Sequence, residues 1–248
     1  MPTHRTVLWL PSLVLSISML VPAAVFAGGD TVVGSGRAQS QTRAITGFEA
    51  IALRGSMKLV LRQGARESVE VRADDNLLPL VETRVVDRSG VATLEIGPVA
   101  NANWQTRSEM KVTVDLVTLK SLSVTGAGDV VSEALKTPAL KLVVSGSGDL
   151  HLRQLSADEL SVKVSGSGDV ETSGRAARLS VAIAGSGDVN ARALESDEVS
   201  VSIAGSGDAS VNARKTLSVS IAGSGDVSYA GDAAVKTSIA GTGTVKRR

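Results

Sequence analysis

The sequence predicts an all-β fold of the solenoid class, in which similar coils stack along one axis. Two observations predict it. A four-residue phrase, Gly-Ser-Gly-Asp or a close variant, recurs every 18 to 20 residues through the C-terminal half of the chain, and a repeat of this period is typical of stacked supersecondary units. Between the phrases, apolar and polar residues alternate, which is typical of strands with one buried face.

The recurring phrase predicts a tight turn in every coil. Its first copy, Gly-Ala-Gly-Asp, begins at Gly126, and its last, Gly-Thr-Gly-Thr, begins at Gly241. Glycine suits such corners because it adopts positive φ angles and brings no side chain into a crowded bend. A structural turn role is therefore expected for the first glycine of each Gly-x-Gly-Asp phrase: Gly126, Gly146, Gly166, Gly185, Gly205 and Gly223.

The segment before each turn predicts a strand. In one copy Leu160, Val162 and Val164 alternate with polar residues, and another apolar residue, Val170, follows the turn. Two strands and two bends in about twenty residues make one coil, and coils stack at the strand spacing of about 4.8 Å. The seven turn phrases give six steps, so we expect a regular region roughly 29 Å long.

Residues 1–27 are predicted to be a signal peptide. His4 and Arg5 precede an apolar run, and Ala27 ends a stretch of small residues that suits signal peptidase. A membrane anchor is the alternative, but the run contains Pro11 and is shorter than the roughly 20 apolar residues that a spanning helix needs. No later segment is apolar enough to cross a membrane. We expect an exported mature chain, in the periplasm or at the cell surface.

The remaining residues are predicted to form one domain after a short leader. Residues 28–41 are rich in Gly, Ser and Thr and are expected to be disordered. Residues 42–248 are expected to form a single solenoid, with irregular coils in 42–118 and regular repeats in 119–248. A single helical turn is expected at 75–80.

Composition excludes several classes of protein. The 26 Lys and Arg residues less Arg5 leave 25, against 25 Asp and Glu. A net charge of zero gives no support to nucleic-acid binding, which needs a basic surface. The chain has no cysteine, so a disulfide framework and a lipid-anchored form are both excluded.

The order of several motifs resembles a known bacterial family. The stretches Gly47-Phe48-Glu49-Ala50-Ile51 and Asp75-Asn76-Leu77-Leu78, the strand pattern of 110–116, and the serial Gly-Ser-Gly-Asp turns are similar to the head GIN domain. This family is also called the putative auto-transporter adhesin head domain, or domain of unknown function 2807. The resemblance implies a right-handed β-helix-like fold, export and a role in cell adhesion. It implies no catalytic residues and no cofactor.

The acidic residue of each turn phrase is the first candidate site. Stacked coils place these residues in one column, where like charges about 4.8 Å apart repel by about 1 kcal/mol per neighbour. Capping of backbone amides within the turn is one compensation, and a ladder of calcium ions is the alternative. The spacing differs from that of calcium-binding nonapeptide repeats. The column consists of Asp129, Asp149, Asp169, Asp188, Asp208 and Asp226.

The outward face of the later coils is the second candidate site. Its side chains are small and uncharged, whereas earlier coils carry Lys141 and Lys163 there. Such a surface suits contact with a second copy of the chain, or with a cell-surface or envelope partner; a featureless solenoid surface is the alternative. We call it the Ser/Ala face, defined by Ser180, Ala182, Ser200, Ser202, Ser218 and Ser220.

Signals for catalysis or nucleotide binding are weak. A dinucleotide fingerprint needs a helix after its glycines, and here a strand follows. A polysaccharide-cleaving enzyme needs convergent acids or bases. The only candidates are His151 with Asp149 and Arg153, a trio that equally suits a solvated strand. Trp104 favours a cap over the core rather than a platform for sugars.

These observations predict an exported, non-enzymatic β-solenoid that acts in cell adhesion or envelope interactions. A periplasmic structural or ligand-binding scaffold is the alternative, and a polysaccharide-active enzyme is less favoured. No metal or cofactor is expected apart from the calcium alternative at the Asp column. At the last coil, Lys246, Arg247 and Arg248 are expected to discourage strand pairing by their charge; contact with an anionic envelope surface is the alternative.

Overall fold

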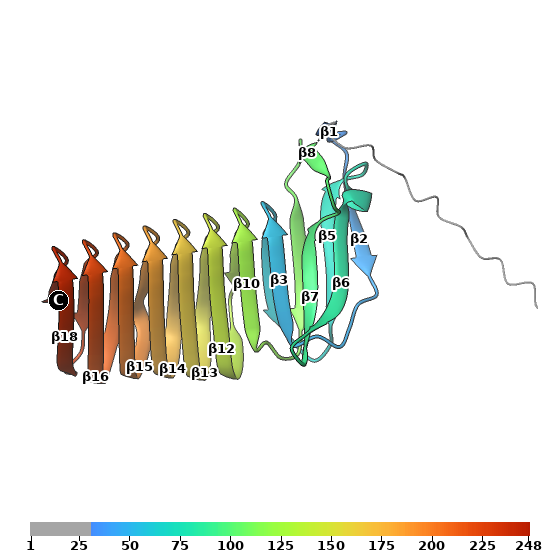
Figure 1. The fold of residues 1–248 in the computed structure, drawn as a ribbon. Coiled ribbons are helices and arrows are strands. Elements are labelled where there is room, and N and C mark those ends of the chain that lie inside the picture. The colour runs from blue at the N-terminus through green and yellow to red at the C-terminus, as the bar shows by residue number, and fades with distance from the viewer. Residues whose placement is uncertain (1–30) are drawn as a thin grey trace, which may run out of the picture.

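The computed structural model describes residues 31–248, so the predicted signal peptide lies outside the described residues. Within this range the chain forms a long stack of coils, with β18 at one end and antiparallel strands at the other (Figure 1). The predicted all-β solenoid is confirmed by parallel pairing of each coil with the next. No helix within these residues is both long and apolar enough to cross a membrane.

The regular half is built from strands that each pair with the equivalent strand one coil away. For example, Leu160 pairs with Leu179, and Gly166 pairs with Gly185. The strands are β10 (Ser121–Gly126), β11 (Val130–Ser132), β12 (Leu135–Gly146), β13 (Leu150–Gly166), β14 (Val170–Gly185), β15 (Val189–Gly205), β16 (Ala209–Gly223), β17 (Val227–Ala230), β18 (Ala234–Gly241) and β19 (Val245–Arg247).

The regular coils, apart from the last, contain one more paired stretch than expected. β13 pairs with β14 through residues 150–152, 155–157 and 159–166, with a register shift between Leu152 and Leu155. The expectation of two strands and two bends is therefore wrong. The middle stretch was missed because its buried positions hold small or polar residues that give weak alternation, such as Ala176 in β14 and Ser196 in β15.

The core is a set of buried columns that run along the stack. Leu160, Val162 and Val164 are buried, and each lies beside an equivalent apolar residue in the neighbouring coils. Burying one Val, Leu or Ile side chain stabilises the fold by about 1.5–3 kcal/mol. Since each coil up to that of β16 repeats the burial, the stack itself supplies the core that one coil could not form alone.

The N-terminal half extends the same stack in a different chain order. β3 (Ala50–Gly55) and β4 (Lys58–Gln63) pair in parallel with β10 and β11. On their other side lie β7 (Val91–Pro98) and β9 (Lys111–Leu116), also in parallel. The chain thus adds the outer coil before returning to β10, which agrees with the irregular coils expected in this half.

Antiparallel strands cover the outer coil. β5 (Ser68–Asp74) pairs with β9, and β6 (Val81–Arg88) pairs with β7. Between them lies a 3-10 turn, η1 (Leu78–Leu80), at the place where a helical turn was predicted. A small separate pair joins β1 (Thr31–Val33) to β8 (Asn103–Gln105). This cap gives the solenoid a covered N-terminal end.

The prediction that residues 28–41 are disordered is wrong from Thr31 onwards. Besides β1, this segment contributes β2 (Ala38–Arg43), which pairs antiparallel with β5. Asp74, which is fully buried, accepts hydrogen bonds from the backbone N–H groups of Gly36 (3.0 Å) and Arg107 (2.9 Å). Such partners are distant in sequence, so the composition of the segment does not reveal them.

Candidate contact face

The turn phrases form a continuous hydrogen-bonded corner. The six predicted turn glycines all have φ between +112° and +146°. The carbonyl of Gly166 accepts hydrogen bonds from the N–H groups of Ser186 (2.9 Å) and Gly187 (3.1 Å) in the next coil. A Cβ atom on Gly187 would lie 2.2 Å from the carbonyl oxygen of Gly168. The second glycine is therefore required by close approach of neighbouring coils.

The Asp column caps this corner from one coil to the next. In each step one carboxylate oxygen, Oδ1, accepts the backbone N–H of the following aspartate, at 3.4 Å for Asp129 and Asp149 and 2.8 to 3.0 Å for the later pairs. The last carboxylate, that of Asp226, accepts both the hydroxyl (2.7 Å) and the N–H (2.8 Å) of Thr244. These two bonds lower the pKa of Asp226.

This geometry does not bring the column together as a metal site. Its members succeed one another singly along the stack, one per coil. Over residues 31–248, no group of three or more acidic, His or Cys side chains could hold a metal ion. The candidate calcium ladder of Asp129, Asp149, Asp169, Asp188, Asp208 and Asp226 thus lacks convergent ligands, and the carboxylates serve as turn caps.

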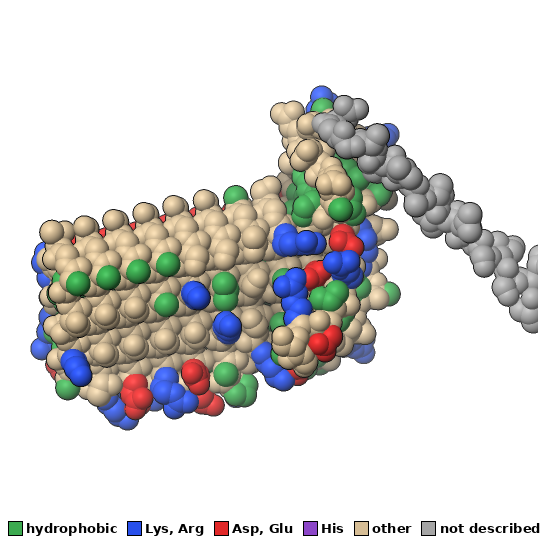
Figure 2. Space-filling model, viewed as in Figure 1, with side chains coloured by type: hydrophobic (Ala, Val, Ile, Leu, Met, Phe, Trp, Pro, Cys, Tyr) green, Lys and Arg blue, Asp and Glu red, His purple; other side chains and the backbone are tan. Residues whose placement is uncertain are grey.

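The predicted Ser/Ala face lies in register on three neighbouring coils. One column runs through Ser180, Ser200 and Ser218. The next runs through Ala182, Ser202 and Ser220. All are exposed except Ala182, which is half-buried. Figure 2 shows this side of the stack as a flat array of small side chains.

The charged residues within the central columns of this face are all basic. From β3 through β10 to β18, the three register columns that run through Ser180, Ala182 and Ala184 carry Arg54, Lys141, Lys163 and Lys236, and no acidic residue occupies these columns. The exposed side chains otherwise are mostly Ser, Thr and Ala. The surface is therefore flat, hydroxyl-bearing and weakly positive on a protein whose total charge is near zero.

One border of the face is a row of paired charges. Glu159, Arg178 and Glu198 occupy one register column, and Arg178 forms an ion pair with Glu159 (3.5 Å). Asp197, the residue before Glu198, accepts a hydrogen bond from Lys215 at 3.0 Å, and this bond lowers the pKa of Asp197. Exposed pairs of this kind contribute little stability, about 0 to 1 kcal/mol each. Their effect here is to separate the Ser/Ala face from the rest of the surface.

The residues considered for catalysis do not form a site. His151 Nδ1 lies 3.1 Å from Glu171 Oε2 in the next coil, since the two residues are in register. Arg153 pairs instead with Glu133 (3.6 Å), and the carboxylate of Asp149 is engaged in the turn. The three side chains thus have separate partners.

Trp104 lies in β8, where it is in register with Val32 of β1. It is half-buried and packs against the core, as expected of a cap.

The fold and its corners define a class, a β-solenoid of parallel coils with glycine turns and a capped N-terminal end. The chain belongs to the head GIN domain family: the sequence model of the family described as "Putative auto-transporter adhesin, head GIN domain" matches residues 47–233. The resemblance seen in the sequence is thereby confirmed. A comparison with curated proteins gives no match.

Solved structures of three bacterial proteins share the fold. A putative adhesin from Bacteroides fragilis is 24% identical over 88% of this chain and 100% of its own, with a TM-score of 0.78. One from Parabacteroides distasonis is 26% identical over 88% and 100%, with a TM-score of 0.73. One from Parabacteroides merdae is 25% identical over 89% and 100%, with a TM-score of 0.68.

Proposed function

We propose that this protein is an exported, non-enzymatic adhesion module of the bacterial envelope, and that the Ser/Ala face is its contact surface. Membership of a family described as an adhesin head domain supports an adhesion-like role. The observation that carries the assignment to this face is the register of Ser180, Ser200 and Ser218 with their neighbours, which makes a flat surface free of acidic side chains.

The face suits repeated weak contacts with an extended partner. Small side chains let another surface approach closely, and serine hydroxyls both donate and accept hydrogen bonds. Each coil presents the same positions again, so contacts add along the stack. Linked weak contacts raise the total affinity well above that of a single one. The partner is a cell-surface or envelope component, or a second copy of the chain.

The location of the protein tests the adhesive role. Intact cells that express the protein are treated with protease, with a periplasmic protein as internal control. An adhesion module should be cleaved or labelled from outside while the control stays intact. Protection of both proteins until the outer membrane is opened would contradict adhesion and favour a periplasmic scaffold.

Bulkier neutral side chains on the face test the contact surface. Ser202→Gln together with Ser220→Gln should lower adhesion, or self-association measured by sedimentation, about tenfold, because the added atoms prevent close approach. That loss corresponds to about 1.4 kcal/mol. The matched control is Ser206→Gln with Ser224→Gln. These exposed serines belong to the same coils but lie in the Gly-Ser-Gly-Asp turns. Equal adhesion by both double variants would argue against the face.

A further inference from the structure

A groove of about 570 Å³ follows the corner where the middle stretch of the coils bends toward the Ser/Ala face. It crosses three successive coils, those of β12, β13 and β14. Its volume falls within the range of small-molecule sites, roughly 300–1,000 Å³. We call it the corner groove. It is separate from the residues of the Ser/Ala face.

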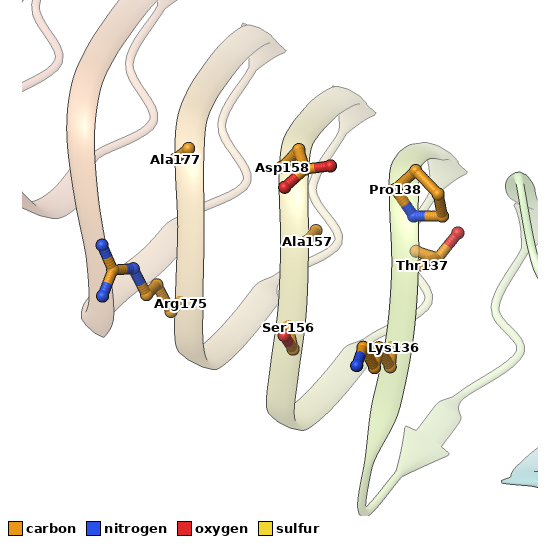
Figure 3. A pocket seen from close by; sticks show the side chains of 8 residues that line it. All are labelled: Lys136, Thr137, Pro138, Ser156, Ala157, Asp158, Arg175 and Ala177. Carbon is orange, nitrogen blue, oxygen red and sulfur yellow. The ribbon is translucent and has the colours of Figure 1, made fainter.

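Two rows of side chains line the corner groove (Figure 3). One row consists of Lys136, Ser156 and Arg175, which are in register on consecutive coils. The opposite row consists of Pro138, Asp158 and Ala177. Large residues at Lys136 and Arg175 thus flank a small one, so the surface is hollowed at Ser156. The backbone positions of Lys136 and Arg175 are two coil steps apart, roughly 9.6 Å along the axis, and the Arg175 side chain extends away from Lys136 over the next coil (Figure 3).

The two cations are available to a ligand. Other basic side chains near the corner groove form ion pairs, Arg178 with Glu159 and Arg214 with Asp197. Lys136 and Arg175 have no ion-pair partner among residues 31–248, and both are exposed. Arg175 contributes to the electrostatic field at Asp197 without forming an ion pair with it. A negative group entering the groove would therefore not have to displace an existing carboxylate.

We propose that the corner groove binds an acidic oligosaccharide that runs along the coils. Carboxylates on alternate sugars would contact Lys136 and Arg175. A hydroxyl of the intervening sugar would donate to the exposed carboxylate of Asp158 and accept from the hydroxyl of Ser156. Charge-assisted hydrogen bonds are about twice as strong as neutral ones, so this recognition does not need the aromatic platforms typical of neutral sugar sites.

Asp158 distinguishes a sugar from other polyanions. A carboxylate between two cations repels a chain with one phosphate per unit, whereas it accepts hydrogen bonds from hydroxyls. Single-stranded nucleic acids also need stacking side chains, and the described part of the chain places none in the groove. The basic residues of the adjoining face, Lys141 and Lys163, add long-range attraction for an anionic polymer.

Calorimetric titration of the protein with a hyaluronan tetrasaccharide, in which every second sugar carries a carboxylate, tests this inference. We expect measurable binding at physiological salt, at least tenfold weaker for the carboxyl-reduced tetrasaccharide. Lys136→Gln with Arg175→Gln should lower the affinity at least tenfold, and Asp158→Asn about threefold. The matched control, Lys141→Gln with Lys163→Gln, removes the same charge from the face and should change the affinity less than threefold. Circular dichroism checks that each variant is folded.

Three results would overturn the inference. They are no detectable binding at millimolar sugar, equal binding of the acidic and neutral sugars, and equal losses in the groove and control double variants. Inorganic polyphosphate that binds as tightly, with affinity raised by Asp158→Asn, would make the groove a general polyanion site instead. Loss of sugar binding in a variant that still adheres through the Ser/Ala face separates this inference from the proposed function, on which it does not rest.

Discussion

Gly187 lies where two successive turns come closest together. Its amide donates to Gly166, and its α-carbon faces the backbone carbonyl of Gly168. The neighbour is backbone in the middle of a paired column, so it cannot move without breaking hydrogen bonds in the adjoining coils. At this scale the motif is a steric requirement of stacking, independent of any ligand.

Gly187→Ala should lower the free energy of unfolding by about 1–3 kcal/mol, the usual cost of overpacking. The added Cβ would meet the Gly168 oxygen at 2.2 Å and Val164 Cγ1 at 2.9 Å. The denaturant midpoint measures the effect. Gly64→Ala is the control, because no atom lies within 4 Å of its Cβ position, and it should be neutral or slightly stabilising. Equal midpoints for both variants would contradict the steric account.

Among the structural elements, the cap depends on a single buried carboxylate. Asp74 ends β5 and receives hydrogen bonds from the loop before β2 and from the loop between β8 and β9. The N–H of Arg107 and then the hydroxyl of Ser108 hold the pKa of Asp74 at about 2. This clasp orders a segment whose composition predicts disorder.

The clasp predicts a pH dependence at the acidic end. Because the folded pKa of Asp74 lies below its unfolded value near 3.8, its stabilising effect is complete above about pH 4 and is lost as the pH falls toward 2. Asp74→Asn should lower the melting temperature at pH 7 and flatten its dependence on pH between 4 and 2, as measured by calorimetry. A variant whose slope in this window equals that of the wild type would disprove the role.

The regular strands could be predicted from the sequence because Leu160, Val162 and Val164 alternate within one continuous strand. The outer coil could not, since β3 lies between β7 and β10, and parallel neighbours need not follow one another in the chain. The Ser/Ala face follows directly from the alternation. The corner groove does not, because it depends on small residues such as Ser156 and Ala177 lying between larger ones on adjacent coils.

The whole molecule presents two different surfaces along one axis, the flat Ser/Ala face and the corner groove beside it. The first offers shape and hydroxyl groups, and the second offers separated charges at Lys136 and Arg175. The two surfaces can be distinguished experimentally, because binding to the Ser/Ala face depends on close approach and binding to the corner groove depends on charge. A partner that carries acidic sugars on a flat surface could engage both at once, with the gain that linked contacts bring.

Gly166 and Gly185 occupy equivalent positions one coil apart and make the same contacts with their neighbours. An internal duplication or loss of one repeat unit therefore joins the chain to itself in register at the glycine turns. Each such event changes the reach of the rod by about 4.8 Å and leaves the cap and the final strands as they were. Reach can consequently evolve in discrete steps, separately from the chemistry that the rod displays.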